Sequence, residues 1–172
     1  ILEYKKAIEL NPNYVIAYYN IANRKFDLGD FIGAIGGYNK VIELNPSHNE
    51  AYYARGLSRF RNNNFKGAIE DYNQALTFNP NDANIYYNRG LSKFNLGDYS
   101  GATEDYSKVI QINPQDARAY NNRGGISDKL NNFKAAIEDY TKTIEINPND
   151  ASVYYNRGSV KFKLKDYTGA KE

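Results

Sequence analysis

Apolar and aromatic side chains recur along this chain at helical spacing, and the same pattern returns every 34 residues. Within one such stretch, apolar positions in residues 99–112 follow the i, i+3, i+4 spacing of an amphipathic helix: Tyr99, Ala102, Tyr106, Val109 and Ile110. A shorter stripe precedes it in residues 83–96, where Tyr86, Gly90 and Phe94 lie on successive turns. We predict two helices per stretch, with these positions in the core.

Polar residues, glycine and proline mark the ends of these helices. Asp82 and Asp98 stand where an N-cap side chain is needed, and Gly97 suits the left-handed residue that ends a helix. The residue before a proline avoids the helical region, so Asn113-Pro114 ends the second helix. The turn between the two helices recurs at Gly29-Asp30, Asn63-Asn64, Asn131-Asn132 and Lys165-Asp166. Each stretch is therefore predicted to be a helical hairpin.

The period of the whole chain is set by its prolines, each preceded by Asn and each 34 residues from the next: Pro12, Pro46, Pro80, Pro114 and Pro148. A fixed period of this length indicates a helical repeat array. Full repeats cover residues 15–48, 49–82, 83–116 and 117–150, and partial repeats cover 1–14 and 151–172. We expect one elongated domain over 1–172, because repeats add core layer by layer.

Two columns of residues support this stacking. Small residues recur on first helices, where backbones should approach closely: Ala22, Gly56, Gly90, Gly124 and Gly158. Large partners recur on second helices: Tyr4, Tyr38, Tyr72, Tyr106 and Tyr140. Gly inside a helix costs up to about 1 kcal/mol against Ala, so its recurrence implies a steric reason.

With an aromatic residue, then Gly, Ala, Tyr and Pro at fixed offsets, the chain resembles the tetratricopeptide repeat family over its whole length. The resemblance implies an all-α fold, a right-handed superhelical α-solenoid of tandem helix-turn-helix hairpins, with first helices lining a concave groove. One departure is a charged column where the family usually carries Leu: Arg55, Arg89, Arg123 and Arg157.

The first repeat suggests partners for these arginines. It has Ile21 in place of Arg and Gly36-Gly37 in place of the Glu-Asp pairs of later repeats. We therefore expect an ion pair within each of three repeats: Arg55 with Asp71, Arg89 with Asp105, and Arg123 with Asp139. The alternative is that these acids only solvate the outer face, because exposed ion pairs contribute only about 0–1 kcal/mol.

Composition narrows the function. The net charge is only +2, from 22 basic and 20 acidic residues, so neither nucleic acid nor a membrane surface is favoured as a partner. The apolar runs are far too short for membrane insertion, which needs about 20 apolar residues. The chain has no Cys, which fits a reducing compartment and is also compatible with an oxidising one, so the location stays open, with the cytoplasm favoured.

Residues for catalysis are missing from the sequence. The only His is His48, which follows Pro46 in a turn, and we expect it to be an inert surface residue. There is no glycine-rich phosphate loop and no Cys/His cluster with zinc spacing. We expect no enzyme activity in this segment, no cofactor and no metal.

The face opposite Tyr86 and Lys93 is instead the candidate binding surface. It carries an Asn column interrupted by Ala54, a neighbouring Tyr column, and Asn84: Asn20, Asn88, Asn122, Asn156, Tyr19, Tyr53, Tyr87, Tyr155 and Asn84. An Asn amide donates and accepts, so a ladder of amides can hold the backbone of an extended peptide, and Tyr is enriched at binding hot spots. The alternative is that both columns only help repeats to pack.

Some members of the family bind a terminal carboxylate through Lys, Arg and Asn on three first helices. Only Asn88 and Arg118 match that pattern here, so we expect no strong carboxylate clamp.

We therefore expect a protein–protein interaction scaffold that binds an extended peptide segment of a partner. The alternative is a targeting arm of a larger enzyme such as a glycosyltransferase, and RNA binding ranks last because few basic residues line the groove. The chain begins and ends within a hairpin, so we expect a piece of something longer, and head-to-tail self-association through the incomplete terminal repeats.

Overall fold

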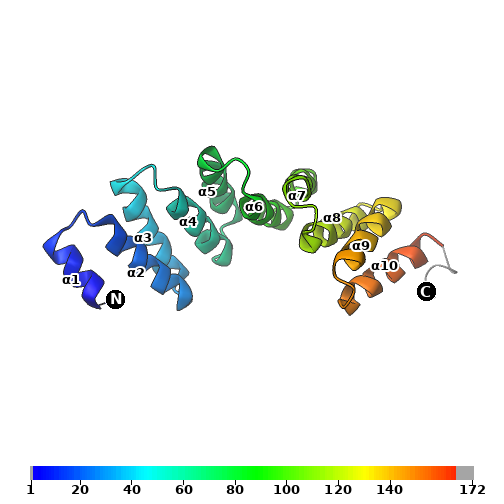
Figure 1. The fold of residues 1–172 in the computed structure, drawn as a ribbon, viewed down its shortest axis with the longest axis horizontal. Helices are drawn as coiled ribbons and strands as arrows, with labels where there is room; N and C mark the ends of the chain where they lie inside the picture. Colours follow the sequence, from blue (N-terminus) through cyan, green and yellow to red (C-terminus); the bar gives the residue numbers. More distant parts are fainter. Residues whose placement is uncertain (1, 166–172) are drawn as a thin grey trace. The chain divides into compact units, whose positions relative to one another are not determined.

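The computed structural model describes residues 2–165, and in that range the secondary structure consists of ten helices. Figure 1 follows them along the chain: α1 Leu2–Leu10, α2 Val15–Asp27, α3 Phe31–Leu44, α4 Asn49–Arg61, α5 Phe65–Phe78, α6 Ala83–Asn95, α7 Tyr99–Ile112, α8 Ala117–Lys129, α9 Phe133–Ile146 and α10 Ala151–Lys163. The predicted helices at 83–96 and 99–112 correspond to α6 and α7. The helix expected after Asp166 lies outside the described residues.

The helices form two compact units, residues 1–96 and 97–172. In the first unit each helix from α1 to α6 packs against the next, and first helices of adjacent repeats also touch directly, α2 with α4 and α4 with α6. In the second unit α7, α8, α9 and α10 likewise pack in order. This all-helical repeat stacking is the solenoid architecture predicted from the 34-residue period, while the extent of a single array stays a prediction.

The predicted left-handed residues at the ends of the first helices are confirmed. Every residue expected to end a first helix has a positive φ: Gly29, Asn63, Gly97, Asn131 and Lys165. N-cap side chains then accept backbone N–H bonds of the next helix, as Asp98 does from Gly101 at 2.9 Å and Asp82 from Asn84 at 2.8 Å. Side chains at these turns therefore satisfy part of the helix ends.

The core follows the predicted columns, except that Tyr4, the first member of the tyrosine column, is 37% exposed. Four second-helix tyrosines are almost fully buried: Tyr38, Tyr72, Tyr106 and Tyr140. The steric reason for Gly56 is direct, because an added Cβ would lie 2.7 Å from Cε1 of Tyr72. Phe94 was predicted to lie in the core but is 37% exposed, so that assignment was wrong; it sits in the last turn of α6, where the stripe reaches the helix end.

The predicted ion pairs form in both repeats in which the structure describes them. Arg55 Nη2 donates to Asp71 Oδ1 at 2.6 Å, and Arg123 Nη2 donates to Asp139 Oδ1 at 2.7 Å. Asp71 and Asp139 are buried, so these are not solvated acids of the outer face. The pairing of Arg89 with Asp105 stays a prediction.

Each of these arginines also reaches the preceding repeat, which the sequence analysis missed. The Nη1 atom donates to a second-helix side chain 16 residues earlier: Arg55 to Asn39 at 2.7 Å, Arg89 to Asn73 at 2.7 Å, Arg123 to Ser107 at 3.0 Å and Arg157 to Thr141 at 3.2 Å. The arginine column therefore connects neighbouring hairpins as well as the helices of one hairpin.

Candidate functional site

A cavity of about 290 Å³ lies in the first unit between two first helices. Tyr19, Asn23 and Phe26 enter it from α2, and Tyr38 enters from α3. The α4 helix contributes the other four lining residues: Glu50, Tyr53, Ala54 and Leu57. Two tyrosines of the predicted binding column, Tyr19 and Tyr53, are thus brought to one concave site.

The rings around this cavity are fixed by packing. The ring centroid of Tyr19 is 5.8 Å from that of Tyr38, and the centroid of Tyr53 is 6.0 Å from that of Tyr72. Tyr38, which is almost fully buried, donates its hydroxyl to Oδ1 of Asn23 at 2.6 Å. Aromatic pairs at these separations are favourable, so packing against neighbouring rings holds Tyr19 and Tyr53 in the cavity walls.

The cavity lies at the one position where the Asn column is interrupted, at Ala54. Other repeats carry Asn at the position equivalent to Ala54, for example Asn20 and Asn88. The methyl group of Ala54 occupies less space than an amide, and Ala54 lies in the cavity lining. The interruption noted in the sequence therefore coincides with the hollow in the surface.

Glu50 is the only charged residue among those described as lining the cavity. Its side chain is 69% exposed, and its Oε2 lies 3.2 Å from Nδ1 of His48, without hydrogen-bond geometry. Burial raises the pKa of Tyr19, partly offset by a hydrogen bond with Asn23 and reinforced by the nearby carboxylate of Glu50. Burial likewise raises the pKa of Tyr38, so both phenols stay neutral at physiological pH.

His48 is not the unpartnered surface residue that was expected. Its ring centroid lies 4.9 Å from that of Tyr19, and its side chain is largely buried. It makes no side-chain cap bond to α4, unlike the Asp residues at the equivalent positions of other repeats. His48 therefore packs against a wall of the cavity from the N-cap position just before α4.

Asn88 lies on α6, half-buried, with its amide partly engaged. The Nδ2 atom donates to the hydroxyl of Tyr53 at 3.0 Å and to the backbone carbonyl of Asn84 at 2.8 Å. These bonds use both N–H groups, so only Oδ1 remains to accept a bond from a peptide. The amide can therefore accept a hydrogen bond from a peptide, but its donor groups are already used. Its bond to Tyr53 links α6 to a wall of the cavity.

The other predicted residues of the first unit are not among those described as lining this cavity. Asn20 is half-buried on α2, Tyr87 is half-buried on α6, and Asn84 is exposed in the first turn of α6.

Predicted site residues of the second unit have different surroundings. Asn122 and Asn156 are half-buried on α8 and α10, and Tyr155 is 77% exposed. Arg118 forms a two-point ion pair with Asp116, from Nε at 3.0 Å and Nη2 at 2.7 Å. Asp116 is also the N-cap residue of α8, so the side chain of Arg118 is bound to the residue that caps its own helix.

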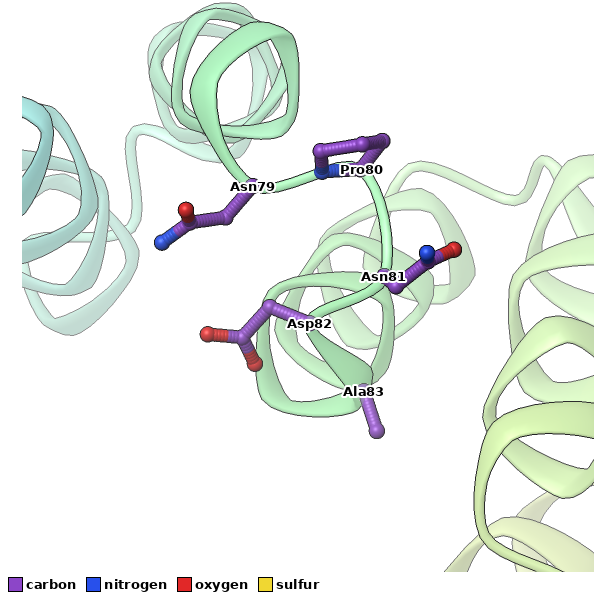
Figure 2. A pocket seen from close by; sticks show the side chains of 5 residues that line it. All are labelled: Asn79, Pro80, Asn81, Asp82 and Ala83. Carbon is purple, nitrogen blue, oxygen red and sulfur yellow. The ribbon is translucent and has the colours of Figure 1, made fainter.

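A second hollow lies at the turn between α5 and α6. Its lining consists only of consecutive turn residues: Asn79, Pro80, Asn81, Asp82 and Ala83. Figure 2 shows Asn79 and Asp82 projecting to the same side, with Asn81 pointing away from them. Asp82 already caps α6, and the Asn-Pro turn recurs in each repeat, so we assign this hollow to turn geometry.

The same turns show a contact that the sequence analysis did not predict. First-helix tyrosines donate their hydroxyls to the proline carbonyl six residues earlier: Tyr18 to Pro12, Tyr52 to Pro46, Tyr86 to Pro80 and Tyr154 to Pro148. The constant offset between the two columns was the available signal. These tyrosines are structural, whereas the next residue along, as in Tyr53, faces the cavity.

Residues 2–165 contain neither a cluster of metal-ligating side chains nor a membrane-spanning helix. No group of His, Cys, Asp and Glu side chains there could hold a metal ion. Over the same residues, no helix has the length and apolar character that crossing a membrane requires.

Comparison with protein families gives consistent matches. A model described as TPR repeat matches residues 58–97, and models described as Tetratricopeptide repeat match residues 83–116, 117–150 and 139–172. No curated protein sequence matched.

Solved structures share the fold. The MamA protein is 28% identical, with a TM-score of 0.87, over 91% of this chain and 85% of that one. YrrB, a TPR protein with an unusual peptide-binding site, is 24% identical, with a TM-score of 0.83, over 97% and 86%. MamA from Desulfovibrio magneticus RS-1 is 23% identical, with a TM-score of 0.82, over 86% and 84%.

Proposed function

Because the chain belongs to the tetratricopeptide repeat family, we propose that it is a protein–protein interaction scaffold that binds an extended segment of a partner along its first helices. The observation that carries this proposal is the cavity between α2 and α4, which both Tyr19 and Tyr53 line. A concave, aromatic-lined site with a few polar groups is the usual form of a binding pocket.

The polar groups beside the cavity fit a peptide backbone. The half-buried Asn88 has a free Oδ1 acceptor and is held in place by Tyr53. Asn20, Asn122 and Asn156 repeat this position on other first helices. In the proposal these amides bind main-chain groups and the tyrosines supply contact area. YrrB shows that a protein with this fold can present a peptide site.

Peptide selection tests the proposal. Random linear peptides are selected by display on the immobilised protein, and the affinity of selected peptides is measured by fluorescence anisotropy. One lost hydrogen bond is worth about 1 kcal/mol, so Asn88→Ala should weaken binding about fivefold.

The matched control is Asn81→Ala, which removes an exposed amide in the turn of Figure 2. It should leave the affinity unchanged. Failure to enrich any peptide, or selected peptides that tolerate replacement of Tyr19, Tyr53 and Asn88, would contradict the proposal.

A further inference from the structure

We infer that the cavity between α2 and α4 binds one cationic side chain of the partner segment, with arginine preferred. This inference rests on the proposed function and adds the specificity of one peptide position.

The size of the cavity limits its occupant. A volume of about 290 Å³ lies at the lower end of small-molecule pockets, which span about 300–1,000 Å³. It is suited to a single long side chain rather than to a cofactor. The small side chain of Ala54 leaves this volume open, because an Asn amide at the same position would project into the cavity.

The walls favour a cation. Tyr19, Tyr53 and Phe26 contribute aromatic rings, and a guanidinium over a ring face is attracted by the ring quadrupole and stacks on it. The chain already forms this arrangement internally, with Arg guanidinium carbons 5.2–5.8 Å from Tyr ring centroids: Arg55 over Tyr52, Arg89 over Tyr86, Arg123 over Tyr120 and Arg157 over Tyr154.

The charge of the lining has one sign. Glu50 supplies a carboxylate, and none of the residues described as lining the cavity is basic. The charge of Asp27 also raises the pKa of Tyr38. Oδ2 of Asp27 lies 3.5 Å from Nη1 of Arg24, so this carboxylate already has a cationic partner. Asn23 Oδ1 accepts one bond from Tyr38 and has a second lone pair for an incoming N–H. The carboxylate of Glu50 would repel an anionic side chain. A neutral side chain would lack both the attraction to Glu50 and the cation–π attraction to the aromatic rings.

Single-residue probes test the inference. N-acetyl-arginine methylamide is titrated into ¹⁵N-labelled protein and compared with N-acetyl-citrulline methylamide, which has the same shape without the charge. The amide shifts of Tyr19, Tyr53 and Leu57 report binding. We expect the arginine probe to bind about fivefold more tightly, with a preference that shrinks at high salt.

Two variants check the location. Ala54→Asn introduces the residue that other repeats carry at this position, so the fold should be kept while the cavity is filled and probe binding is lost. Glu50→Gln should remove most of the preference for arginine over citrulline. Glu138→Gln, the same change at an exposed residue of α9, should have no effect.

Equal binding of arginine and citrulline, or arginine binding that survives Ala54→Asn, would overturn the inference. Display-selected peptides that depend on Asn88 but show no arginine or lysine preference would also overturn it, and would leave the proposed function intact. Failure to enrich any peptide would overturn the proposed function and, with it, the role assigned here to the cavity.

Discussion

At the scale of single residues, the buried charge of Asp71 is balanced by two arginines. Arg55 donates to it from Nε and Nη2, and Nη1 of Arg59 lies 3.1 Å from its Oδ2. Burial raises the pKa of Asp71, and the hydrogen bonds and charge of Arg55 pull that pKa down without cancelling the rise. The pKa of Asp71 is therefore higher in the folded state than in the unfolded state, so this group stabilises the fold at low pH, where it is protonated. That stabilisation is lost as the pH rises through the folded-state pKa.

Replacing Arg55 should therefore be costly at neutral pH. Arg55→Met leaves a buried carboxylate with only Arg59 beside it, and we expect a loss of about 3 kcal/mol in the free energy of unfolding. The pKa of Asp71 should rise further, and the loss should shrink at low pH, where Asp71 is protonated. Urea titrations at two pH values and carboxyl-carbon NMR measure both effects.

Two comparisons control this prediction. Arg55→Met with Asp71→Asn should recover part of the loss, because no buried charge remains. The pKa of Asp116 should stay below its ordinary value, since burial is outweighed there by Arg118 and by backbone N–H groups. An Asp71 pKa that is unchanged by Arg55→Met would show that the arginine does not act on it.

Adjacent glycines of α3 offer a second residue-scale prediction. An added Cβ at Gly37 would lie 2.7 Å from Cβ of Ala22, whereas at Gly36 it would meet no described atom within 4 Å. Because Ala is the better helix former, Gly36→Ala should stabilise by up to about 1 kcal/mol, and Gly37→Ala should destabilise despite the same gain in propensity. Thermal unfolding of both variants decides this, and equal shifts in Tm would contradict it.

At the scale of the helix, equivalent cap positions differ. Asn64 accepts a bond from the backbone N–H of Gly67 at 3.0 Å, whereas Asn132 makes no side-chain cap bond to α9. The sequence predicted the same turn at both positions, but in the structure only Asn64 makes a side-chain cap bond.

The pair makes a matched experiment. Asn64→Ala should cost about 1 kcal/mol in the free energy of unfolding, and Asn132→Ala only a few tenths, because only the first removes a cap bond. Urea unfolding followed by circular dichroism gives both values. Similar losses would mean that Asn132 also caps its helix in solution.

At the scale of the molecule, stability in a repeat stack is a sum of local and nearest-neighbour terms. Within the first unit these terms differ strongly between helices. The α1 helix has no buried residue, while α5 has six: Gly67, Ala68, Asp71, Tyr72, Ala75 and Leu76. Opening of α1 should therefore need much less free energy than opening of α5.

Hydrogen exchange followed by NMR tests this gradient. Backbone amides of α1 should exchange fastest among the helices of the first unit, those of α5 slowest, and those of α3, with three buried residues, in between. Uniform protection across α1, α3 and α5 would show that the unit opens as one body.

The sequence by itself determined the helices, their turns and the core columns. These depend on local physics that repeats every 34 residues: helical periodicity, a positive φ at Gly97 and Asn63, and capping by Asp98. It also predicted that Arg55 and Asp71 pair, because the first repeat lacks both members together, and the structure decided between this pairing and acids that only solvate the outer face.

Only the tertiary structure decided the site. The sequence marked Tyr19, Tyr53 and the gap at Ala54, but a cavity depends on how far apart α2 and α4 lie, which no single helix specifies. The bond from Asn88 to Tyr53 and the reach of Arg55 to Asn39 likewise join different repeats. Such contacts are set by the distance between packed helices, whereas the columns are set by spacing within one.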